Sequence, residues 1–217
     1  MDLLLPPHCV GCDAYGPWLC ERCLASLPRL VPPLCNRCGA PTVWPVARCV
    51  ECSGRRLAFA SARAAVAYAG ASRAAVRAWK ERALRPVASL AADVVMEVVP
   101  RPAANVITYI PPDGDRSLKR GHHPAQRLAC ELAAGWGLEL RPLLARTRRV
   151  EQQATLPLAE RRRNVRGAFR ASGDVPTRVV LVDDVYTSGA TVNAAASALR
   201  AAGARRVEVV TFARAVR

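Results

Sequence analysis

The chain has 217 residues, enough for a main domain of about 150 residues and a small additional module. Its 51% hydrophobic and 23% charged residues are typical of a folded globular protein and exclude a largely disordered one. No apolar run reaches the roughly 18–20 residues that a transmembrane segment needs, and the N-terminus shows no evident signal peptide. We therefore expect a cytoplasmic protein.

The net charge of +15 favours polyanionic partners, which include nucleic acid, nucleotides and the anionic inner face of a membrane, where the protein would be peripheral. Only Lys80 and Lys119 are lysines, so nearly all of the positive charge comes from arginine. Together with the many alanines and prolines, this composition is also typical of G+C-rich codon usage. The places where the arginines cluster therefore say more about anion binding than their total does.

Cysteines dominate the first 52 residues, where eight of the nine form Cys-x-x-Cys pairs: Cys9/Cys12, Cys20/Cys23, Cys35/Cys38 and Cys49/Cys52. In a reducing compartment such pairs are typical of metal ligands and not of disulfides. Eight thiolates suffice for two structural zinc ions, which replace the core that so short a segment cannot build. The simplest pairing is sequential, giving two zinc ribbons, but the spacing leaves an interleaved cross-brace open.

After the cysteines, alternating strands and helices predict a parallel α/β sheet flanked by helices. We place the double zinc ribbon at residues 1–55, a linker at 53–61 and the α/β domain at 62–217. The expected strands are residues 64–68, 105–110, 138–144, 179–182 and 206–212. The expected helices are residues 71–84, 86–98, 124–134 and 192–202, with a short helix beginning at Pro157. Within these helices we expect Lys80 to be solvated, with contact to an anion as the alternative, and Cys130 to be a buried small hydrophobic residue.

The strand at residues 179–182 reads as fully buried and ends in Asp183 and Asp184, at the edge where open α/β sheets bind ligands. The turn into the next helix then gathers small and hydroxyl residues: Thr187, Ser188, Gly189, Ala190 and Thr191. Backbone N–H groups at a helix N-terminus form a phosphate seat, while the paired carboxylates suit hydroxyl groups or a metal-bound part of the ligand. This combination predicts a sugar-phosphate site. The alternatives are that the aspartates only cap the following helix or that they are an unrelated acidic pair of the Walker-B kind.

The densest basic stretch, residues 146–170, precedes this motif and holds eight arginines against Glu151 and Glu160. We select six of them as candidates for phosphate or nucleic-acid contact: Arg148, Arg149, Arg161, Arg162, Arg163 and Arg166. The guanidinium fork matches phosphate oxygens, which favours anion binding over the alternative of a solvated helix face.

The apolar strand, Asp-Asp and Thr-x-Gly-x-Thr resemble the phosphoribosyl-pyrophosphate (PRPP) motif of type I phosphoribosyltransferases. With the cysteine pairs, Arg120-Gly121, and the segment Gln153-x-x-Leu156-x-x-x-x-Arg161-x-x-Asn164-Val165-x-x-Ala168-Phe169, the whole chain resembles the ComF family of phosphoribosyltransferase-like competence proteins. That resemblance implies a type I phosphoribosyltransferase-like α/β domain behind a double zinc ribbon.

The resemblance also implies roles for particular residues. Asp183 and Asp184 would contact the ribose 2- and 3-hydroxyls alongside Mg²⁺, and residues 187–191 would hold the 5-phosphate. The pyrophosphate end would face the loop that contains Pro112, Arg116, Arg120 and Gly121. Asp113 and Asp115 depart from the family pattern in that loop, and they either repel pyrophosphate or bind it through Mg²⁺.

Three functions are compatible with these features. The first is a ComF-type protein that binds PRPP or a related ribose phosphate and supports DNA uptake in natural transformation, handling single-stranded DNA together with other DNA-uptake proteins. The second is an active phosphoribosyltransferase that moves phosphoribose from PRPP to a nucleobase-like acceptor. The third is a PRPP-sensing regulator whose ribbons bind a protein partner.

Overall fold

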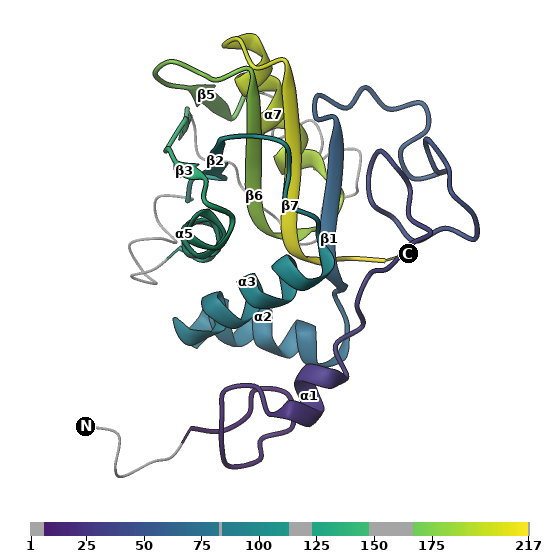
Figure 1. The fold of residues 1–217 in the computed structure, drawn as a ribbon, viewed down its shortest axis with the longest axis vertical. Helices are drawn as coiled ribbons and strands as arrows, with labels where there is room; N and C mark the ends of the chain where they lie inside the picture. The colour runs from purple at the N-terminus through teal and green to yellow at the C-terminus, as the bar shows by residue number, and fades with distance from the viewer. Residues whose placement is uncertain (1–6, 83, 113–122, 148–166, 217) are drawn as a thin grey trace.

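A five-stranded parallel sheet forms the centre of the computed structural model, which describes residues 7–82, 84–112, 123–147 and 167–216. The strand order is β1-β7-β6-β2-β3 (Figure 1). The strands are β1 (Ser61–Ala67), β2 (Val106–Tyr109), β3 (Glu139–Leu140), β6 (Arg178–Tyr186) and β7 (Arg206–Arg214). The parallel sheet predicted from the sequence is therefore confirmed.

Strand β6 lies in the middle because residues 179–182 are apolar on both faces of the sheet and all are buried. Val180 and Val182 pack into one core with helices α2 (Gly70–Arg82), α3 (Pro86–Val98) and α5 (Pro124–Trp136). Val179 and Leu181 pack into a second core with helix α7 (Ala190–Ala201). The sheet therefore has helices on both faces.

The expected strand at residues 138–144 is divided in the structure. β3 ends at Leu140, and β4 (Leu144–Arg146) leaves the main sheet to pair antiparallel with β5 (Phe169–Ala171). Pro142 lies between the two and lacks a backbone N–H, which explains why one ladder cannot run through. β4 remains beside the carboxyl end of β2, because Leu143 N–H donates to Thr108 Oγ1 at 3.1 Å and Arg146 Nε donates to the Pro111 carbonyl at 3.0 Å.

Cys130 differs from its prediction, because it is exposed on the outer face of α5. The helical spacing explains this result: Leu128, Ala129 and Leu132 take the inward face, and Cys130 falls on the opposite side. Within the described residues, no helix is both long and apolar enough to span a membrane.

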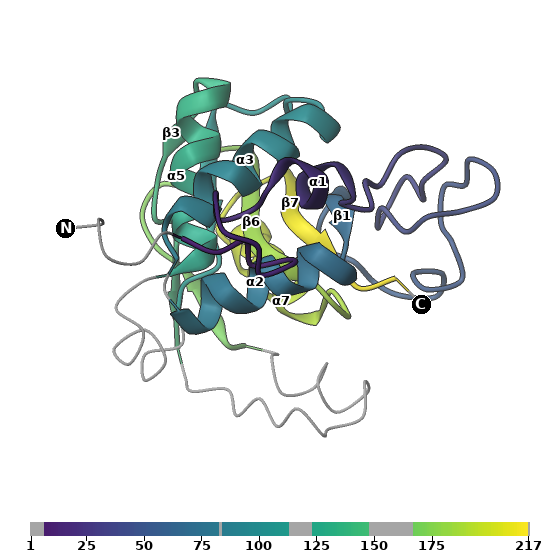
Figure 2. The ribbon, with the colours of Figure 1, turned by 90° about the horizontal axis from the view of Figure 1, so that it is seen from below.

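The first ribbon lies next to α2, and the second lies beside the edge strand β1 (Figure 1, Figure 2). Cys9, Cys23 and helix α1 (Glu21–Ala25) belong to the first, which packs against α2 and α3, whereas the second packs into the core beneath α7. The chain between them follows the outer edge of β1, where Leu30 N–H donates to Ala65 O at 2.8 Å. This connection covers backbone groups that an edge strand otherwise exposes.

Candidate functional site

The two carboxylates that end the apolar run of β6 lie at the carboxyl end of the sheet, as predicted from the sequence. Asp183 aligns with Thr211 of β7, and the neighbouring Val182 aligns with Tyr109 of β2. Asp184 is 9% exposed, and Asp183 is partly buried. A pair of acids so placed faces the space above the strand ends, where ligands of open α/β sheets bind.

Lys80 reaches this pair from α2, so the expectation that it is solvated is wrong. Its Nζ lies 2.8 Å from Asp184 Oδ2, and the two side chains are 34% and 13% exposed. The contact spans more than a hundred residues of sequence, so no local pattern reveals it. One available clue is that this chain uses arginine nearly everywhere else; lysine supplies a compact point charge where arginine's planar fork does not fit.

Burial and neighbouring charges shift the pKa values of Asp183 and Lys80. Burial, followed by the nearby charge of Asp184, raises the pKa of Asp183 from its ordinary 3.8 to about 7, against the opposing effect of Lys80. The Asp184 N–H also donates to Asp183 Oδ1 at 2.9 Å. Burial acts to lower the pKa of Lys80, but attraction to Asp184 outweighs it and the pKa is raised. Lys80 is therefore a built-in counter-ion of the site.

We expect Lys80→Met to lower the free energy of unfolding by about 1–3 kcal/mol, because it leaves the largely buried Asp184 without a cation. The matched control is Arg77→Met on the same helix, whose ion pair with Glu81 has side chains 67% and 61% exposed. That exposed pair is worth about 0.5 kcal/mol or less. Urea unfolding of both variants checks the prediction, and equal losses would contradict it.

The raised pKa of Asp183 predicts a pH-dependent stability difference. Native Asp183 keeps its proton to about pH 7, whereas the unfolded chain releases it near 3.8. Between these values the native state binds more protons, so this carboxyl's contribution to stability falls as pH rises and is level above about 7. Asp183→Asn removes the dependence. In urea unfolding, the free energy of unfolding of the Asn variant should therefore increase relative to that of the unsubstituted protein as pH rises across this range. A difference that does not change with pH would contradict the assignment.

The turn from β6 into α7 has the geometry of an anion-binding site at a helix N-terminus. Gly189 has φ +71°, and a Cβ added there would collide with Tyr186 Oη, so this position requires glycine. Ala190 N–H donates to Ser188 Oγ at 3.3 Å, and α7 begins at Ala190 with its first N–H groups at the turn. Ser188 is buried, Thr191 is partly buried and Thr187 is exposed. The helix N-terminus favours a phosphate here.

The opposite side of the site is formed by the end of β2 and by β4. Pro112 follows β2, and Arg146 Nε donates to the carbonyl of the preceding Pro111 at 3.0 Å. Arg146 also lies over the ring of Phe169, 4.9 Å from its centroid. The other predicted residues of this side and of the basic stretch lie outside the described residues: Asp113, Asp115, Arg116, Arg120, Gly121, Arg148, Arg149, Arg161, Arg162, Arg163 and Arg166.

The eight paired cysteines form two clusters, and the pairing is sequential: Cys9, Cys12, Cys20 and Cys23 in one, Cys35, Cys38, Cys49 and Cys52 in the other. Within each cluster all Sγ atoms lie within 4.8 Å of one another. The Cys38–Cys49 separation of 3.5 Å and the Cys12–Cys20 separation of 3.7 Å fit a tetrahedral ion with Zn–S bonds of about 2.3 Å.

The surroundings of the thiolates fit zinc as well. Cys20 N–H donates to Cys9 Sγ at 3.4 Å, and Cys49 N–H donates to Cys35 Sγ at 3.3 Å. Outer hydrogen bonds of this kind orient metal ligands and stabilise the thiolate form. The residues therefore fit two structural zinc ions, one in each cluster.

Comparisons with known proteins agree with this architecture. The family model for the double zinc ribbon domain matches residues 1–56, and that for the phosphoribosyl transferase domain matches residues 118–216. Competence protein F of Haemophilus influenzae is 32% identical over 105 residues, which are 46% of each chain. The aligned part thus spans less than half the length of that relative.

Two solved structures also align with the chain. The protein TT1426 from Thermus thermophilus is 21% identical with a TM-score of 0.34, and the alignment covers 59% of this chain and 82% of that one. The purine phosphoribosyltransferase from Pyrococcus horikoshii is 18% identical with a TM-score of 0.32, covering 63% of this chain and 83% of that one.

The structure and the family matches give the same two domains in the same order along the chain. A double zinc ribbon comes first, and a phosphoribosyltransferase domain with its acid pair at the sheet edge follows. This order of domains and the similarity to competence protein F over 46% of each chain together support a ComF-like protein.

Proposed function

We propose that the chain binds PRPP or a related ribose 5-phosphate at the carboxyl end of β6. The observation that carries the proposal is the union, in one strand-to-helix turn, of a buried acid pair and a glycine-centred loop at a helix N-terminus. The loop, residues 187–191, holds the 5-phosphate through backbone N–H and hydroxyl groups. Above about pH 7, where Asp183 has lost its proton, Asp183 and Asp184 accept hydrogen bonds from the ribose hydroxyls as carboxylates.

We propose that Mg²⁺ binds together with PRPP, because carboxylate and phosphate oxygens are the ligands that this ion prefers. The pyrophosphate end then faces the β2 side of the site, where Pro112 lies and Arg146 is bound to the Pro111 carbonyl. The experiment is a calorimetric titration of the protein with PRPP, with and without Mg²⁺. Saturable binding to one site per chain supports the proposal, and no binding of either PRPP or ribose 5-phosphate contradicts it.

At the level of the cell, the proposed role is DNA uptake through the handling of single-stranded DNA, with other DNA-uptake proteins as partners. Two observations support it: the relative's name, competence protein F, and the net charge of +15. Aromatic residues are only 5% of the chain, so stacking on bases contributes little and affinity should be mainly electrostatic. Binding to single-stranded DNA should therefore weaken steeply as salt rises.

A charge-matched pair of variants tests the proposed DNA-binding residues. Replacing Arg161, Arg162 and Arg163 with glutamine should weaken binding and flatten the salt dependence, by about 0.7 in the log–log slope for each phosphate that is no longer neutralised. The control replaces the exposed Arg73, Arg77 and Arg82 of α2 with glutamine and removes the same charge elsewhere. Equal weakening by the two variants, or affinity that does not respond to salt, would contradict the proposal.

A second candidate function is phosphoribosyl transfer itself, which the phosphoribosyl transferase match over residues 118–216 favours. Pyrophosphate would leave from ribose C1 as a nucleobase-like acceptor attacks, with the protein positioning both. Incubation with PRPP, Mg²⁺ and a panel of bases, followed by measurement of released pyrophosphate, separates catalysis from binding. Release that depends on one base supports transfer, and binding without release supports the first proposal.

A further inference from the structure

The second ribbon contacts the phosphate loop directly through Arg55. Arg55 Nη2 donates to the Ser188 carbonyl at 3.0 Å, and its Nη1 donates to the Glu51 carbonyl at 3.4 Å. Glu51 lies between two ligands of the second cysteine cluster, Cys49 and Cys52. One guanidinium group thus joins the backbone of a zinc knuckle to the backbone of the loop, across more than a hundred residues of sequence.

The direction of this contact matters for an anion. The Ser188 carbonyl and the Gly189 N–H belong to one planar trans peptide group and point in opposite directions. Because Arg55 holds the carbonyl toward the ribbon, the Gly189 N–H is directed away from the ribbon. Gly189 has φ +71°, and glycine can move from this conformation to others at little cost. A contact from outside the loop, such as that of Arg55, is therefore needed to keep the peptide in one orientation.

Arg214 makes a second connection between the second ribbon and the loop. Arg214, 1% exposed, donates to the Cys38 carbonyl through Nη1 at 2.6 Å and to Glu51 Oε2 through Nη2 at 2.7 Å. Its guanidinium lies 4.6 Å from the centroid of the Tyr186 ring, and Tyr186 Oη fills the space where a Cβ of Gly189 would be. The second cluster therefore supports both the start of the loop and its central glycine.

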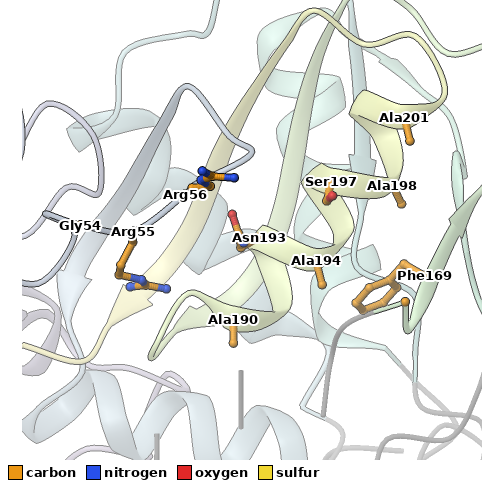
Figure 3. Close-up of a pocket in the computed structure, with 11 residues that line it drawn as sticks. Gly54, Arg55, Arg56, Phe169, Ala190, Asn193, Ala194, Ser197, Ala198 and Ala201 are labelled. Carbon is orange, nitrogen blue, oxygen red and sulfur yellow. The ribbon is translucent and has the colours of Figure 1, made fainter. Parts of the chain in front are cut away.

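A groove beside the Arg55 contact lies between the end of the second ribbon and α7 of the α/β domain (Figure 3). Arg55 and Arg56 form one wall of a cavity of about 710 Å³, α7 forms its floor and Phe169 lies on the other side. Ala58 N–H donates to Asn193 Oδ1 of α7 at 2.7 Å. In the described residues, the hydrogen bonds to residues 186–193 from this part of the chain come from Arg55, at the end of the second ribbon, and from Ala58 of the linker after it, whereas the first ribbon packs on α2 and α3.

We propose that Arg55 is a positioning residue, which sets the orientation of the Ser188–Gly189 peptide for phosphate binding, and that the second cysteine cluster, but not the first, thereby controls ligand affinity. This inference rests on the proposed ribose-phosphate site. It assigns unequal roles to two ribbons with the same ligand sets: the first stabilises the face of the sheet that α2 and α3 cover, and the second maintains the shape of the binding loop.

The test is a calorimetric titration with ribose 5-phosphate of the full chain, with Arg55→Met compared with Arg56→Met. Arg56 is an exposed neighbour that lines the same groove, so its variant removes the same charge without touching the loop. We expect the affinity for ribose 5-phosphate to fall about tenfold in the Arg55 variant, because it loses one hydrogen bond from a charged group. In the Arg56 variant the affinity should stay within about twofold of the original value. Arg55→Lys, which retains the charge but not the fork, should fall between them.

Two further measurements distinguish positioning from other roles. The amide resonance of Gly189 should move in ligand-free Arg55→Met, and the salt dependence of the remaining affinity should stay as in the unsubstituted protein. A salt dependence that shrinks along with the affinity would show that Arg55 pairs directly with the phosphate, which would overturn the inference. Both variants should contain two zinc ions.

Cysteine variants test the unequal roles and do not depend on the Arg55 variant being folded. Cys49→Ser removes one ligand of the second cluster and should weaken ribose 5-phosphate at least tenfold. Cys12→Ser removes one ligand of the first and should leave affinity unchanged. Equal losses in the two variants, or unchanged affinity in Arg55→Met, would overturn the inference while the proposed function stands. No binding by the unsubstituted protein would overturn both.

Discussion

Replacing Gly189 with alanine should weaken ribose 5-phosphate binding by about a hundredfold or more, the largest effect that we expect from a single methyl group in this chain. The added Cβ collides with Tyr186 Oη, and the left-handed φ of +71° costs alanine about 1–2 kcal/mol in addition. The loop then has to move, and two or more of its N–H groups lose their alignment with the phosphate, each worth about 1.5–3 kcal/mol.

Gly137 provides the matched control for this variant. It has a similar φ of +63° at the C-terminal end of α5, and a Cβ added there meets no atom within 4 Å. Gly137→Ala should therefore lose stability by about 1–2 kcal/mol from backbone strain and keep full ligand affinity. Thermal unfolding and calorimetry on both variants separate the strain from the collision. Comparable binding by the two variants would show that the phosphate does not sit at the β6–α7 turn.

Removal of zinc should be the most destabilising change. Structural zinc contributes about 10–16 kcal/mol in small zinc domains, and here the clusters support much more than themselves. Cys35 and Cys52 are fully buried in the core that contains Phe59 and α7, and Leu27 and Cys23 belong to the core of α2 and α3. We expect a strong chelator to lower the unfolding temperature by more than about 10 °C and to expose the outer edge of β1, with aggregation as the result.

The measurements for this prediction are zinc content by atomic absorption and thermal unfolding. The unsubstituted protein should hold two ions per chain, and Cys35→Ser should hold one and unfold at lower temperature. Cys130→Ser is the control, because Cys130 is exposed on α5 and outside both clusters. It should retain two ions and an unchanged unfolding temperature. A chain that loses its zinc and keeps its unfolding temperature would contradict a structural role for the ions.

Much of the fold is predictable because its determinants are local. The run of apolar residues at 179–182 identifies a buried strand, the acids after it mark the sheet edge, and the cysteine spacing indicates zinc. The division of one expected strand into β3 and β4 depends on Pro142, a residue whose missing N–H is itself a local signal against a continuous strand. The sequential cysteine pairing, by contrast, depends on the three-dimensional structure, which excludes the cross-brace.

The parts of the site that sequence reasoning missed all depend on contacts between distant segments. Lys80 lies on a helix far from the acid pair in sequence. Its spacing of four residues from the buried Val76 places it on the inward face of α2, but that spacing does not identify Asp184 as its partner. Arg55 and Arg214 look like ordinary surface arginines in a chain rich in them, yet both connect the second ribbon to the β6–α7 turn. Tertiary packing determines such contacts, and composition obscures them because arginine is abundant throughout the chain.

The central claim is that the acid pair and the β6–α7 turn form one ribose-phosphate site, and a single comparison tests it most directly. PRPP with Mg²⁺ is titrated calorimetrically above about pH 7, where Asp183 is ionised, into the unsubstituted protein and into Asp183→Asn, Asp184→Asn, a double variant that retains side-chain size and removes both charges. We predict saturable binding to the first and at least about hundredfold weaker binding to the second, since two charged hydrogen-bond acceptors are removed. Equal affinity in the two proteins would contradict the claim.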